Sequence, residues 1–519
     1  MPKQQNKIVA VLNRFGINLA DIFSDNTTEG LLGDLHNDSR AIKSGDIFCA
    51  IIGSAQDGRL YTQIAVNNGA SLIISECENE LDHGKLTRLK NTNDKEIIVV
   101  NFYQLNNALF SLSKLFYGNP QSQMSMIGIT GTNGKTSTSQ LLGQLLSSLN
   151  MPCGIIGTNG YGLIDALTPL NNTTPSATDL HQIFLQFIDN KVTCVAMEAS
   201  SHALEQGRVY ADLFDIALFT NLSRDHLDYH STMAEYAAAK KLIFTGDSSQ
   251  IAVLNGDDKQ AQQWLNTWPA QQTVWVFGKE KQHNANQYYV QASNIVHSEQ
   301  GVSFTLNTHL GNIEINSPLL GDFNVDNLLA AISVLMIQHI SIEQIAAKIK
   351  ELAPIAGRME STSLTGHATT VVDYAHTPDA LEKALMACKQ HCHGNLWVVF
   401  GCGGDRDKGK RPLMTKAADQ IADFLVITSD NPRTENAQAI VDDMMAELDQ
   451  EKRSKITVIL DREKAVLSTL KSAQENDIVL LAGKGHENYI IMGNETIAYN
   501  EREIVANYYN TLAQRKASL

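Results

Sequence analysis

The chain has 519 residues, too many for one hydrophobic core, and at roughly 150 residues per domain this length predicts about three domains. Lys and Arg total 41 against 56 Asp and Glu, and the resulting net charge of -15 argues against a nucleic-acid partner. Seven scattered cysteines are typical of reduced thiols, and no run approaches the roughly 20 apolar residues of a membrane span. The N-terminus lacks the pattern of a secretory signal, so we expect a soluble cytoplasmic protein.

The first 105 residues carry three short apolar runs that predict strands, at 47–52, 71–75 and 97–100. Turn residues separate the first two runs, and the charged stretch 76–95 separates the last two. This alternation predicts a small α/β domain over residues 1–105.

The rest of the chain alternates apolar strands with helical segments in two successive parts. In residues 106–354 the pattern predicts helical segments, among them a helix at 135–148, and strands at 127–130, 192–197, 214–220 and 251–255. In residues 355–519 it predicts strands at 369–375, 396–401, 424–428, 456–460 and 478–483. We therefore expect an α/β protein of three domains, with a central parallel-sheet domain and a Rossmann-like C-terminal domain, each with loops at its strand ends where ligands collect.

The segment 127-IGITGTNGKTST-138 has the features of a phosphate-binding loop, although Ile129 stands where the standard pattern has glycine. A predicted strand precedes the loop and a predicted amphipathic helix, 136–146, follows it, so helix N–H groups and the helix dipole attract an anion there. Two glycines allow close backbone approach, a lysine adds charge for the outer phosphates and a threonine offers a hydroxyl to Mg²⁺: Gly131, Gly134, Lys135 and Thr136. The central domain is therefore predicted to be a P-loop ATPase domain.

Metal ligands can be sought at the ends of the following strands. Glu198 follows an apolar run and is either a Mg²⁺ ligand or an ordinary strand-end carboxylate. Two histidines and two aspartates follow the next run, either as metal ligands or as a solvated loop with helix caps: His226, His230, Asp225 and Asp228. Lys240 lies on the alanine-rich helix beyond them, and the residues alone favour an exposed helix lysine.

Nine motifs in one order resemble the Mur ligases: TGTNGKT, EASSHAL, NLSRDHLDYH, GDFNVDN, GRME, DYAHTP, GGDRDKGKR, DNPRTE and GKGHE. The resemblance covers Asp38 to Glu487. It is closest to the MurE type, whose members add the third amino acid to UDP-N-acetylmuramoyl-L-alanyl-D-glutamate. The resemblance implies an ATP- and Mg²⁺-dependent amide ligase of cytoplasmic peptidoglycan precursor synthesis, and so a role in cell shape and division. We expect it to act as a monomer.

The resemblance also implies roles for individual residues. The catalytic group would be Lys135, Glu198, His226 and Lys240. Metal ligands would be Thr136, Glu198, His226 and Lys240 as a carbamate, with Lys241 as the rival lysine. ATP would contact Gly131, Thr132, Asn133, Gly134, Lys135, Thr136, Ser137, Asn324, Asn327, Arg358 and Asp373. The UDP-sugar dipeptide would contact Ser39, Ser54, Ala55, Gln56, Asn172, Thr173, Thr174, Ser200, Gln206 and Arg208.

The incoming amine is indicated by 430-DNPR-433, which resembles the signature of diaminopimelate-adding members; lysine-adding members depart at the arginine. A distal ammonium plus carboxylate calls for a guanidinium and a carboxylate in the pocket. We expect this pocket to consist of Arg406, Asp430, Asn431, Pro432, Arg433, Gly483 and Glu487. Near the C-terminus, Glu501 is predicted only as a possible helix cap.

Alternatives to this specificity remain open. A lysine-adding ligase is the first. Folylpolyglutamate synthases share the architecture, but their loop usually reads G-K-G where this chain has Lys135-Thr136. A P-loop ATPase that makes no covalent product would hydrolyse ATP without an amino acid.

Overall fold

The computed structural model describes residues 3–19, 33–53, 56–279, 287–298 and 301–517. The chain forms two compact units, each from several segments. The first unit comprises 1–128, 151–215 and 242–246, and the second comprises 129–150, 216–241 and 247–519. The three-domain division at residues 105 and 354 remains a prediction, because these units follow a different partition.

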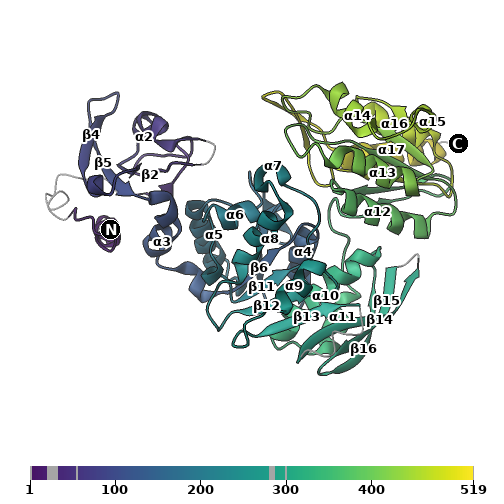
Figure 1. Ribbon diagram of the computed structural model, residues 1–519, viewed down its shortest axis with the longest axis horizontal. Helices are drawn as coiled ribbons and strands as arrows, with labels where there is room; N and C mark the ends of the chain where they lie inside the picture. The colour runs from purple at the N-terminus through teal and green to yellow at the C-terminus, as the bar shows by residue number, and fades with distance from the viewer. Residues whose placement is uncertain (1–2, 20–32, 54–55, 280–286, 299–300, 518–519) are drawn as a thin grey trace. The chain divides into compact units, whose positions relative to one another are not determined.

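The first unit begins with a five-stranded sheet in the order β1-β2-β3-β5-β4 (Figure 1). Its strands are β1 (Leu35–His36), β2 (Ile47–Ala50), β3 (Leu72–Cys77), β4 (Leu86–Lys90) and β5 (Glu96–Tyr103). Its helices are α1 (Lys3–Asn13), η1 (Gly58–Tyr61), α2 (Thr62–Asn67), η2 (Glu80–Asp82), α3 (Leu105–Tyr117) and η3 (Pro120–Gln123). The three predicted strands are confirmed, but the charged stretch 76–95 also contains β4, an edge strand antiparallel to β5.

The remainder of the first unit contains a second set of strands in the pairing order β10-β7-β8-β9. These strands are β7 (Cys153–Gly157), β8 (Gly160–Leu163), β9 (Ala166–Thr168) and β10 (Cys194–Glu198). The helices of this part are α5 (Ala177–Asp189), α6 (Ser201–Glu205), η4 (Ala211–Leu213) and η5 (Leu242–Phe244). Strand β6 (Ser125–Thr130) leads from the first unit into the second, so its last residue opens directly into the phosphate loop.

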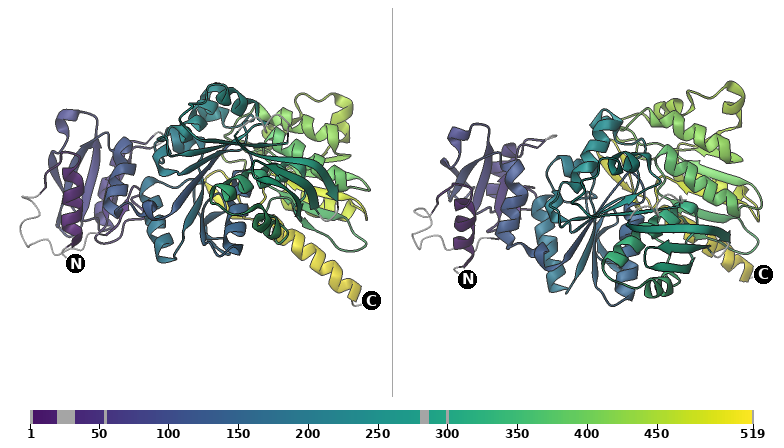
Figure 2. Two further views of the ribbon diagram at one scale, coloured as in Figure 1. Left: turned by 90° about the horizontal axis from the view of Figure 1, so that it is seen from below. Right: turned by 60° about the horizontal axis from the view of Figure 1, so that its bottom comes forward.

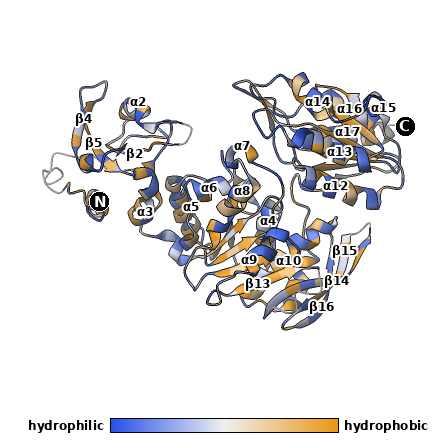
Figure 3. Ribbon diagram, in the orientation of Figure 1, coloured by the Kyte–Doolittle hydropathy of each residue, from blue (hydrophilic) through white to orange (hydrophobic). Residues whose placement is uncertain are grey.

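The second unit contains strands paired in the order β16-β15-β14-β13-β12-β11. The pairs from β11 to β14 are parallel, whereas β15 is antiparallel to both β14 and β16. They are β11 (Ile216–Phe219), β12 (Ile251–Asn255), β13 (Val274–Gly278), β14 (Tyr288–Ser298), β15 (Gly301–Thr308) and β16 (Gly311–Ser317). The helices are α4 (Lys135–Ser148), α7 (Leu227–His230), α8 (Met233–Lys241), α9 (Lys259–Leu265), α10 (Asp322–Ile337) and α11 (Ile342–Ile349). Figure 3 shows apolar residues concentrated along the strands around β13.

Helix α4 has the predicted bounds, but the prediction that it is amphipathic is wrong. Every residue from Thr136 to Leu146 is buried except Gln144, because α10 and α11 also pack against this helix. Its short hydroxyl side chains tolerate burial by bonding to the backbone, as where Ser139 Oγ donates to the Thr136 carbonyl at 3.0 Å. The helix behind the phosphate loop is therefore fixed on nearly all sides.

The C-terminal part of the second unit has a six-stranded sheet in the order β17-β18-β22-β19-β20-β21, parallel except at β17. The strands are β17 (Glu360–Thr362), β18 (Thr369–Asp373), β19 (Leu396–Phe400), β20 (Phe424–Ile427), β21 (Thr457–Val458) and β22 (Ile478–Ala482). One face packs on α12 (Pro378–His391), α13 (Lys410–Ile421) and α14 (Ala437–Met445), and the other on α16 (Arg462–Ser472) and α17 (Glu501–Ala517). A short helix, α15 (Gln450–Lys455), and a separate hairpin, β23 (Tyr489–Met492) with β24 (Glu495–Ala498), complete this part.

The last helix, α17, extends its C-terminal half beyond the sheet on which it packs (Figure 2). Val505 and Tyr509 join its first half to the apolar layer over β18. Among the described residues no helix is long and apolar enough to cross a membrane.

Glu501 is not the cap that the sequence suggested, because Asn500 Oδ1 accepts from the Glu503 amide at the start of α17. Instead, the fully buried Glu501 carboxylate accepts from Arg462 Nε at 2.8 Å and from the Tyr499 hydroxyl at 3.0 Å. The buried ion pair therefore links the first residue of α16 to the first residue of α17.

Glu501→Gln should lower the free energy of unfolding by about 2 kcal/mol, because an amide keeps the shape but loses the charge-assisted bonds to Arg462. Urea denaturation measures the change. Glu503→Gln, at an exposed position on the same helix, is the matched control and should stay within about 0.5 kcal/mol of the parent. Equal effects at both positions would contradict a role for the buried pair.

Candidate functional site

The phosphate loop, Gly131–Gly134, joins β6 to α4 as predicted, and two of its glycines have backbones that L-residues rarely adopt. Gly131 has φ +143° and Gly134 has φ +87°. A Cβ on Gly134 would lie 2.5 Å from Asn327 Oδ1, and one on Gly131 would overlap Thr220 Oγ1. Both glycines are therefore needed because the loop packs closely against neighbouring protein atoms. The backbone N–H groups at the N-terminus of α4 are the feature that attracts an anion here.

Two lysine ammonium groups meet at one carbonyl of this loop. Lys135 Nζ donates to the carbonyls of Gly131 and Thr132, both at 2.8 Å, and Lys240 Nζ donates to the same Gly131 carbonyl at 2.7 Å. Lys240 is only 1% exposed, whereas Lys241 points to solvent. The interpretation of Lys240 as an exposed helix lysine is therefore wrong: α8 turns it inward, toward the loop.

Burial lowers the pKa of Lys240 well below its usual value, and the neighbouring Lys135 ammonium lowers it further. A lower pKa leaves a larger fraction of an amine uncharged, and the uncharged amine is the form that reacts with carbon dioxide. The Nζ also lies 4.4 Å from the centre of the Tyr236 ring. The role of Lys240 as a carbamate remains a prediction.

Two of the predicted nucleotide contacts from later motifs, Arg358 and Asn327, lie beside the start of α4 or the loop within the second unit. Arg358 Nη2 donates to Thr136 Oγ1 at 3.1 Å, and its guanidinium lies 4.6 Å from the centre of the Tyr374 ring. Asp373, buried at the end of β18, accepts from the amides of Met359 and Ala375, each at 2.8 Å. Asn327, beside Gly134, donates to Asn324 Oδ1 at 3.1 Å. Their contacts with ATP remain predictions.

Asp225 was left open between a metal ligand and a cap, and the structure gives it a different position. It is 5% exposed and pairs with Lys410 at 3.3 Å, with His226 at 3.4 Å and with His376 at 3.6 Å. Burial raises its pKa, but Lys410 and the two histidines more than offset this and hold the pKa well below its usual value. The capping interpretation fails for this residue, whereas Asp228 is exposed in α7.

Glu198 lies at the end of β10 in the first unit and is 1% exposed. Thr158 holds both carboxylate oxygens, its amide donating to Oε1 and its hydroxyl to Oε2, each at 3.0 Å. A Cβ on Gly157 would overlap this side chain. The carboxylate is thus fixed in orientation, and its role as a metal ligand remains a prediction.

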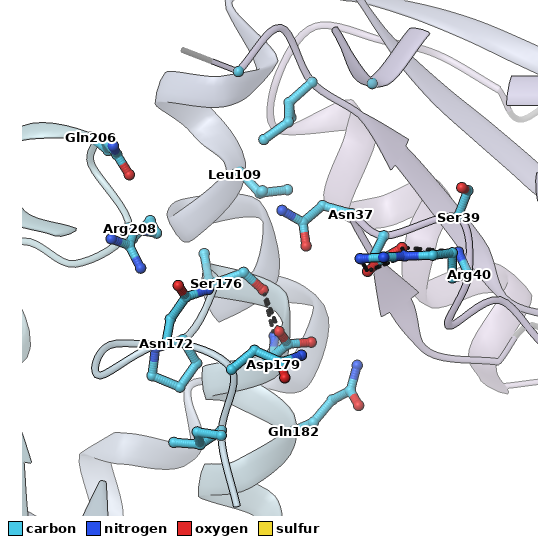
Figure 4. A pocket seen from close by; sticks show the side chains of 18 of the residues that line it. Asn37, Ser39, Arg40, Leu109, Asn172, Ser176, Asp179, Gln182, Gln206 and Arg208 are labelled. Carbon is cyan, nitrogen blue, oxygen red and sulfur yellow. Dashed lines mark hydrogen bonds and ion pairs between the residues drawn. The ribbon is translucent and has the colours of Figure 1, made fainter. Parts of the chain in front are cut away.

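A cavity of about 980 Å³ opens within the first unit and brings together half of the predicted UDP-substrate residues (Figure 4). Figure 4 shows Gln206 and Arg208 on one side and Ser39 and Arg40 on the other. The predicted residues that line it are Ser39, Gln56, Asn172, Gln206 and Arg208. The sequence missed other polar lining residues, among them Asn37, Arg40, Asp179 and Gln182. The volume lies at the upper end of the usual range for small-molecule sites.

Three of the other predicted UDP-substrate residues, all within the described part of the chain, do not line the cavity. Thr173 pairs with the Thr158 hydroxyl at 3.0 Å, and Thr174 Oγ1 donates to the Glu198 carbonyl at 2.8 Å. Ser200 caps α6, accepting from the Ala203 amide. These three therefore lie around Glu198. Ser54 and Ala55 lie outside the described residues.

The predicted amino-acid residues follow three neighbouring strands of the C-terminal sheet. Arg406 follows β19, residues 430–433 follow β20, and Gly483 and Glu487 follow β22. Because the carboxyl ends of parallel strands share one edge, these loops meet there. Gly483 has φ +107°, and a Cβ there would lie 3.1 Å from Asp430 Oδ2.

The contacts at this edge combine cations with carboxylates. Glu487 accepts from Asn431 Nδ2 at 3.0 Å and from the Tyr374 hydroxyl at 3.2 Å. Burial lowers the pKa of Arg433, and the neighbouring Arg406 guanidinium lowers it further. Two guanidinium groups that repel each other are stabilised by an anion between them, and the carboxylate nearby suits an ammonium.

Lys484 is the residue of this site that the sequence reasoning missed. It is fully buried and donates to Asn431 Oδ1 at 2.8 Å, and it pairs with Glu487 at 2.9 Å and Asp430 at 3.0 Å. The signal was available, because Lys484 lies inside the quoted GKGHE motif directly after an apolar strand. A lysine between two glycines suggests an exposed side chain, and only the fold shows its buried partners.

Comparisons with known proteins identify two regions of the chain. Residues 129–335 match the Mur ligase middle domain, and residues 357–485 match the domain described as Mur ligase, glutamate ligase domain. The chain is 42% identical over 478 residues, 92% of its length, to the UDP-N-acetylmuramoyl-L-alanyl-D-glutamate--2,6-diaminopimelate ligase of Haemophilus influenzae, of which 96% is covered.

Solved structures give similar results. The structure of a UDP-N-acetylmuramoyl-L-alanyl-D-glutamate--2,6-diaminopimelate ligase matches with a TM-score of 0.62 and 34% identity, covering 95% of this chain and 99% of that one. The folylpolyglutamate synthase of Mycobacterium tuberculosis, in complex with ADP and AMPPCP, matches with a TM-score of 0.60 over 73% of this chain and 92% of that one. Its identity is 17%, so this second likeness concerns the fold alone.

Proposed function

Because this chain belongs to the Mur ligase family, we propose that it is the ATP-dependent amide ligase that adds meso-diaminopimelate to the D-glutamate γ-carboxylate of UDP-N-acetylmuramoyl-L-alanyl-D-glutamate. The observation that carries the choice of amine is the meeting of Arg433, Arg406 and Glu487 at one sheet edge. The reaction serves peptidoglycan precursor synthesis in the cytoplasm, and through the cell wall it supports cell shape and division. We propose that the enzyme acts as a monomer.

The reaction needs ATP because a carboxylate has no good leaving group. A γ-carboxylate oxygen of D-glutamate attacks the γ-phosphorus of ATP, the bond to the β-phosphate oxygen breaks, and ADP leaves. The amine nitrogen of diaminopimelate then attacks the acyl carbon, loses a proton and expels inorganic phosphate. Lys135 and the N-terminus of α4 neutralise charge on the phosphate oxygens during the first step, and Arg358 is placed beside Thr136 to assist them.

The residues proposed for Mg²⁺ fit an oxygen-preferring ion only if Lys240 is modified. Among the described residues no three His, Cys, Asp or Glu side chains gather as a metal site. The proposed set instead uses Glu198, His226, the Thr136 hydroxyl and Lys240, whose amine must become a carbamate to supply oxygen ligands. The buried Nζ with its depressed pKa suits that change. The bound Mg²⁺ would neutralise phosphate charge.

The cavity of the first unit is proposed to hold the UDP-sugar dipeptide. Ser39, Gln56, Asn172, Gln206 and Arg208 offer hydroxyl, amide and guanidinium groups, which suit the uracil, sugar and phosphate groups of such a ligand. Arg208 already donates to the Thr174 carbonyl, so its guanidinium is oriented before the substrate arrives.

Phosphate release tests the proposal. With ATP, Mg²⁺ and UDP-N-acetylmuramoyl-L-alanyl-D-glutamate present, inorganic phosphate should appear rapidly only after meso-diaminopimelate is added. Lysine in its place should give much lower turnover, because it lacks the distal carboxylate that Arg433 would bind. Turnover without any amino acid would overturn the ligase assignment, and a preference for lysine would overturn the choice of amine alone.

Folylpolyglutamate synthesis is the weaker alternative. The fold likeness to that enzyme extends over 73% of the chain, at 17% identity. A pteroylglutamate substrate in the phosphate-release assay gives a direct comparison, and we expect no release above background.

A further inference from the structure

The backbone of Arg433 has a conformation that an arginine does not adopt freely. Its φ is +50°, in the left-handed region that costs a residue with a Cβ about 1–2 kcal/mol. Such a conformation persists only where neighbouring groups hold it. The question is therefore what holds this residue, whose side chain selects the amine under the proposed function.

The β23–β24 hairpin holds the Arg433 backbone on both sides. The Arg433 amide donates to the Ile491 carbonyl at 3.1 Å, and the Gly493 amide donates to the Arg433 carbonyl at 2.7 Å. These bonds form a parallel bridge between Arg433 and Met492. The guanidinium then reaches the Gly404 carbonyl at 2.9 Å, beside Arg406.

The hairpin is not part of the six-stranded sheet and has only two strands, which alone are marginal in water. Lys484 Nζ donates to the Tyr489 carbonyl at 3.0 Å at its base, and the Ile491 amide donates to Asn431 Oδ1 at 2.9 Å. Every residue of β24 is exposed, so no apolar layer fixes that strand. The hairpin and the 430–433 loop therefore depend on each other for order.

The tip of the hairpin is set by one glycine. Gly493 and Asn494 form a two-residue loop between the paired residues Met492 and Glu495. Gly493 has φ +59°, whereas Asn494 does not have positive φ, which matches a type II′ turn with glycine first. A Cβ on Gly493 meets nothing within 4 Å, so a substitution there acts through the backbone and not through a clash.

We propose that the β23–β24 hairpin is a specificity-determining element of the ligase, which positions the Arg433 guanidinium for the distal carboxylate of the incoming diamino acid by fixing the left-handed Arg433 backbone through Ile491 and Gly493. The identity of the substrate in this inference rests on the proposed function, whereas the backbone contacts of Arg433 do not depend on it. Gly493 is a positioning residue and touches no substrate.

The test compares Gly493→Val with Gly366→Val. Both glycines have positive φ, and a Cβ at either meets nothing within 4 Å, but Gly366 precedes β18, at the opposite end of that strand from Asp373. Gly493→Val should raise the KM for meso-diaminopimelate about tenfold while kcat and the KM for ATP change less than about twofold. Gly366→Val should leave all three constants within about twofold of the parent. Gly493→Ala is the milder variant if the valine enzyme fails to fold.

A double-mutant cycle shows whether the hairpin acts through Arg433. In an Arg433→Ala background, Gly493→Val should change the KM for meso-diaminopimelate by less than about twofold, because the group being positioned is gone. An undiminished tenfold effect in that background would overturn the proposal. So would an unchanged KM in the single variant.

Amide hydrogen exchange tests the role of the hairpin without using the substrate, and therefore independently of the proposed function. Without any substrate, the peptide that contains Arg433 should exchange faster in Gly493→Val than in Gly366→Val. If wild-type enzyme shows no diaminopimelate-dependent phosphate release but exchange still rises, only the proposed function fails. If release occurs and exchange does not change, only the hairpin proposal fails.

Discussion

Lys240→Ala should lower kcat by about a thousandfold, with a KM for each substrate that changes less than about fivefold. The expected loss is of the size seen when one group that neutralises charge in the transition state is removed. Lys240 is buried against the Gly131 carbonyl, so solvent cannot replace it. Steady-state phosphate release, measured separately for ATP and the amino acid, gives the constants.

The chemical test of the same variant is rescue. If Lys240 acts as a carbamate, a small carboxylic acid such as acetate should enter the space left by the side chain and restore roughly tenfold of the lost activity. Lys240→Arg should not be rescued, because a guanidinium stays cationic and fills the space. Lys241→Ala, on the exposed side of α8, is the matched control and should behave as wild type. Full activity of Lys240→Ala, or a loss without rescue, would contradict the carbamate.

The edge of the C-terminal sheet is the part of the site that the sequence predicts best. Its apolar runs mark β19, β20 and β22, and a polar or glycine-containing loop follows each run. Since parallel strands present their carboxyl ends together, Arg406, Arg433 and Glu487 could be expected to meet before any coordinates were known. The structure places Arg406 and Glu487 near Arg433 and adds the buried Lys484, which pairs with Glu487.

What the sequence did not predict is burial that depends on distant partners. Lys240 occupies the inward side of a helix whose alanines give no clear apolar stripe, so periodicity cannot tell which side faces the loop. Asp225 is buried because Lys410, 185 positions later, lies against it. Strand β4 was missed for the opposite reason, since its mostly exposed side chains at a sheet edge lack the apolar signal.

The same reasoning explains the error on α4. Serine and threonine in a helix next to a loop suggest a polar face, but here Thr136 to Ser139 are buried, and α10 and α11 pack against the helix. Serine and threonine hydroxyl groups that donate hydrogen bonds to carbonyls of their own helix can be buried against other helices. A helix that is packed on nearly all sides holds its N-terminal amide groups in one orientation. The predicted phosphate site requires such a fixed orientation.

Arg433→Ala should raise the KM for meso-diaminopimelate about a hundredfold and leave the KM for ATP within about twofold. The change removes a charge-assisted bond to the distal carboxylate, worth about 2–3 kcal/mol. Because lysine has no distal carboxylate, its poor turnover should not fall further. The variant should therefore lose most of its discrimination between the two amines, and a competition assay with both present measures the ratio.

Two further variants separate the geometry of Arg433 from its charge. Arg433→Lys keeps the cation but loses the planar fork, so the KM for meso-diaminopimelate should still rise about tenfold. Arg453→Ala removes an exposed arginine of α15, in the same sheet domain, and should leave the KM unchanged. If Arg433→Ala raised the KM values for ATP and diaminopimelate together, Arg433 would be acting on the closure or folding of the site. If it raised neither, Arg406, another guanidinium at that edge, would be the residue that binds the distal carboxylate.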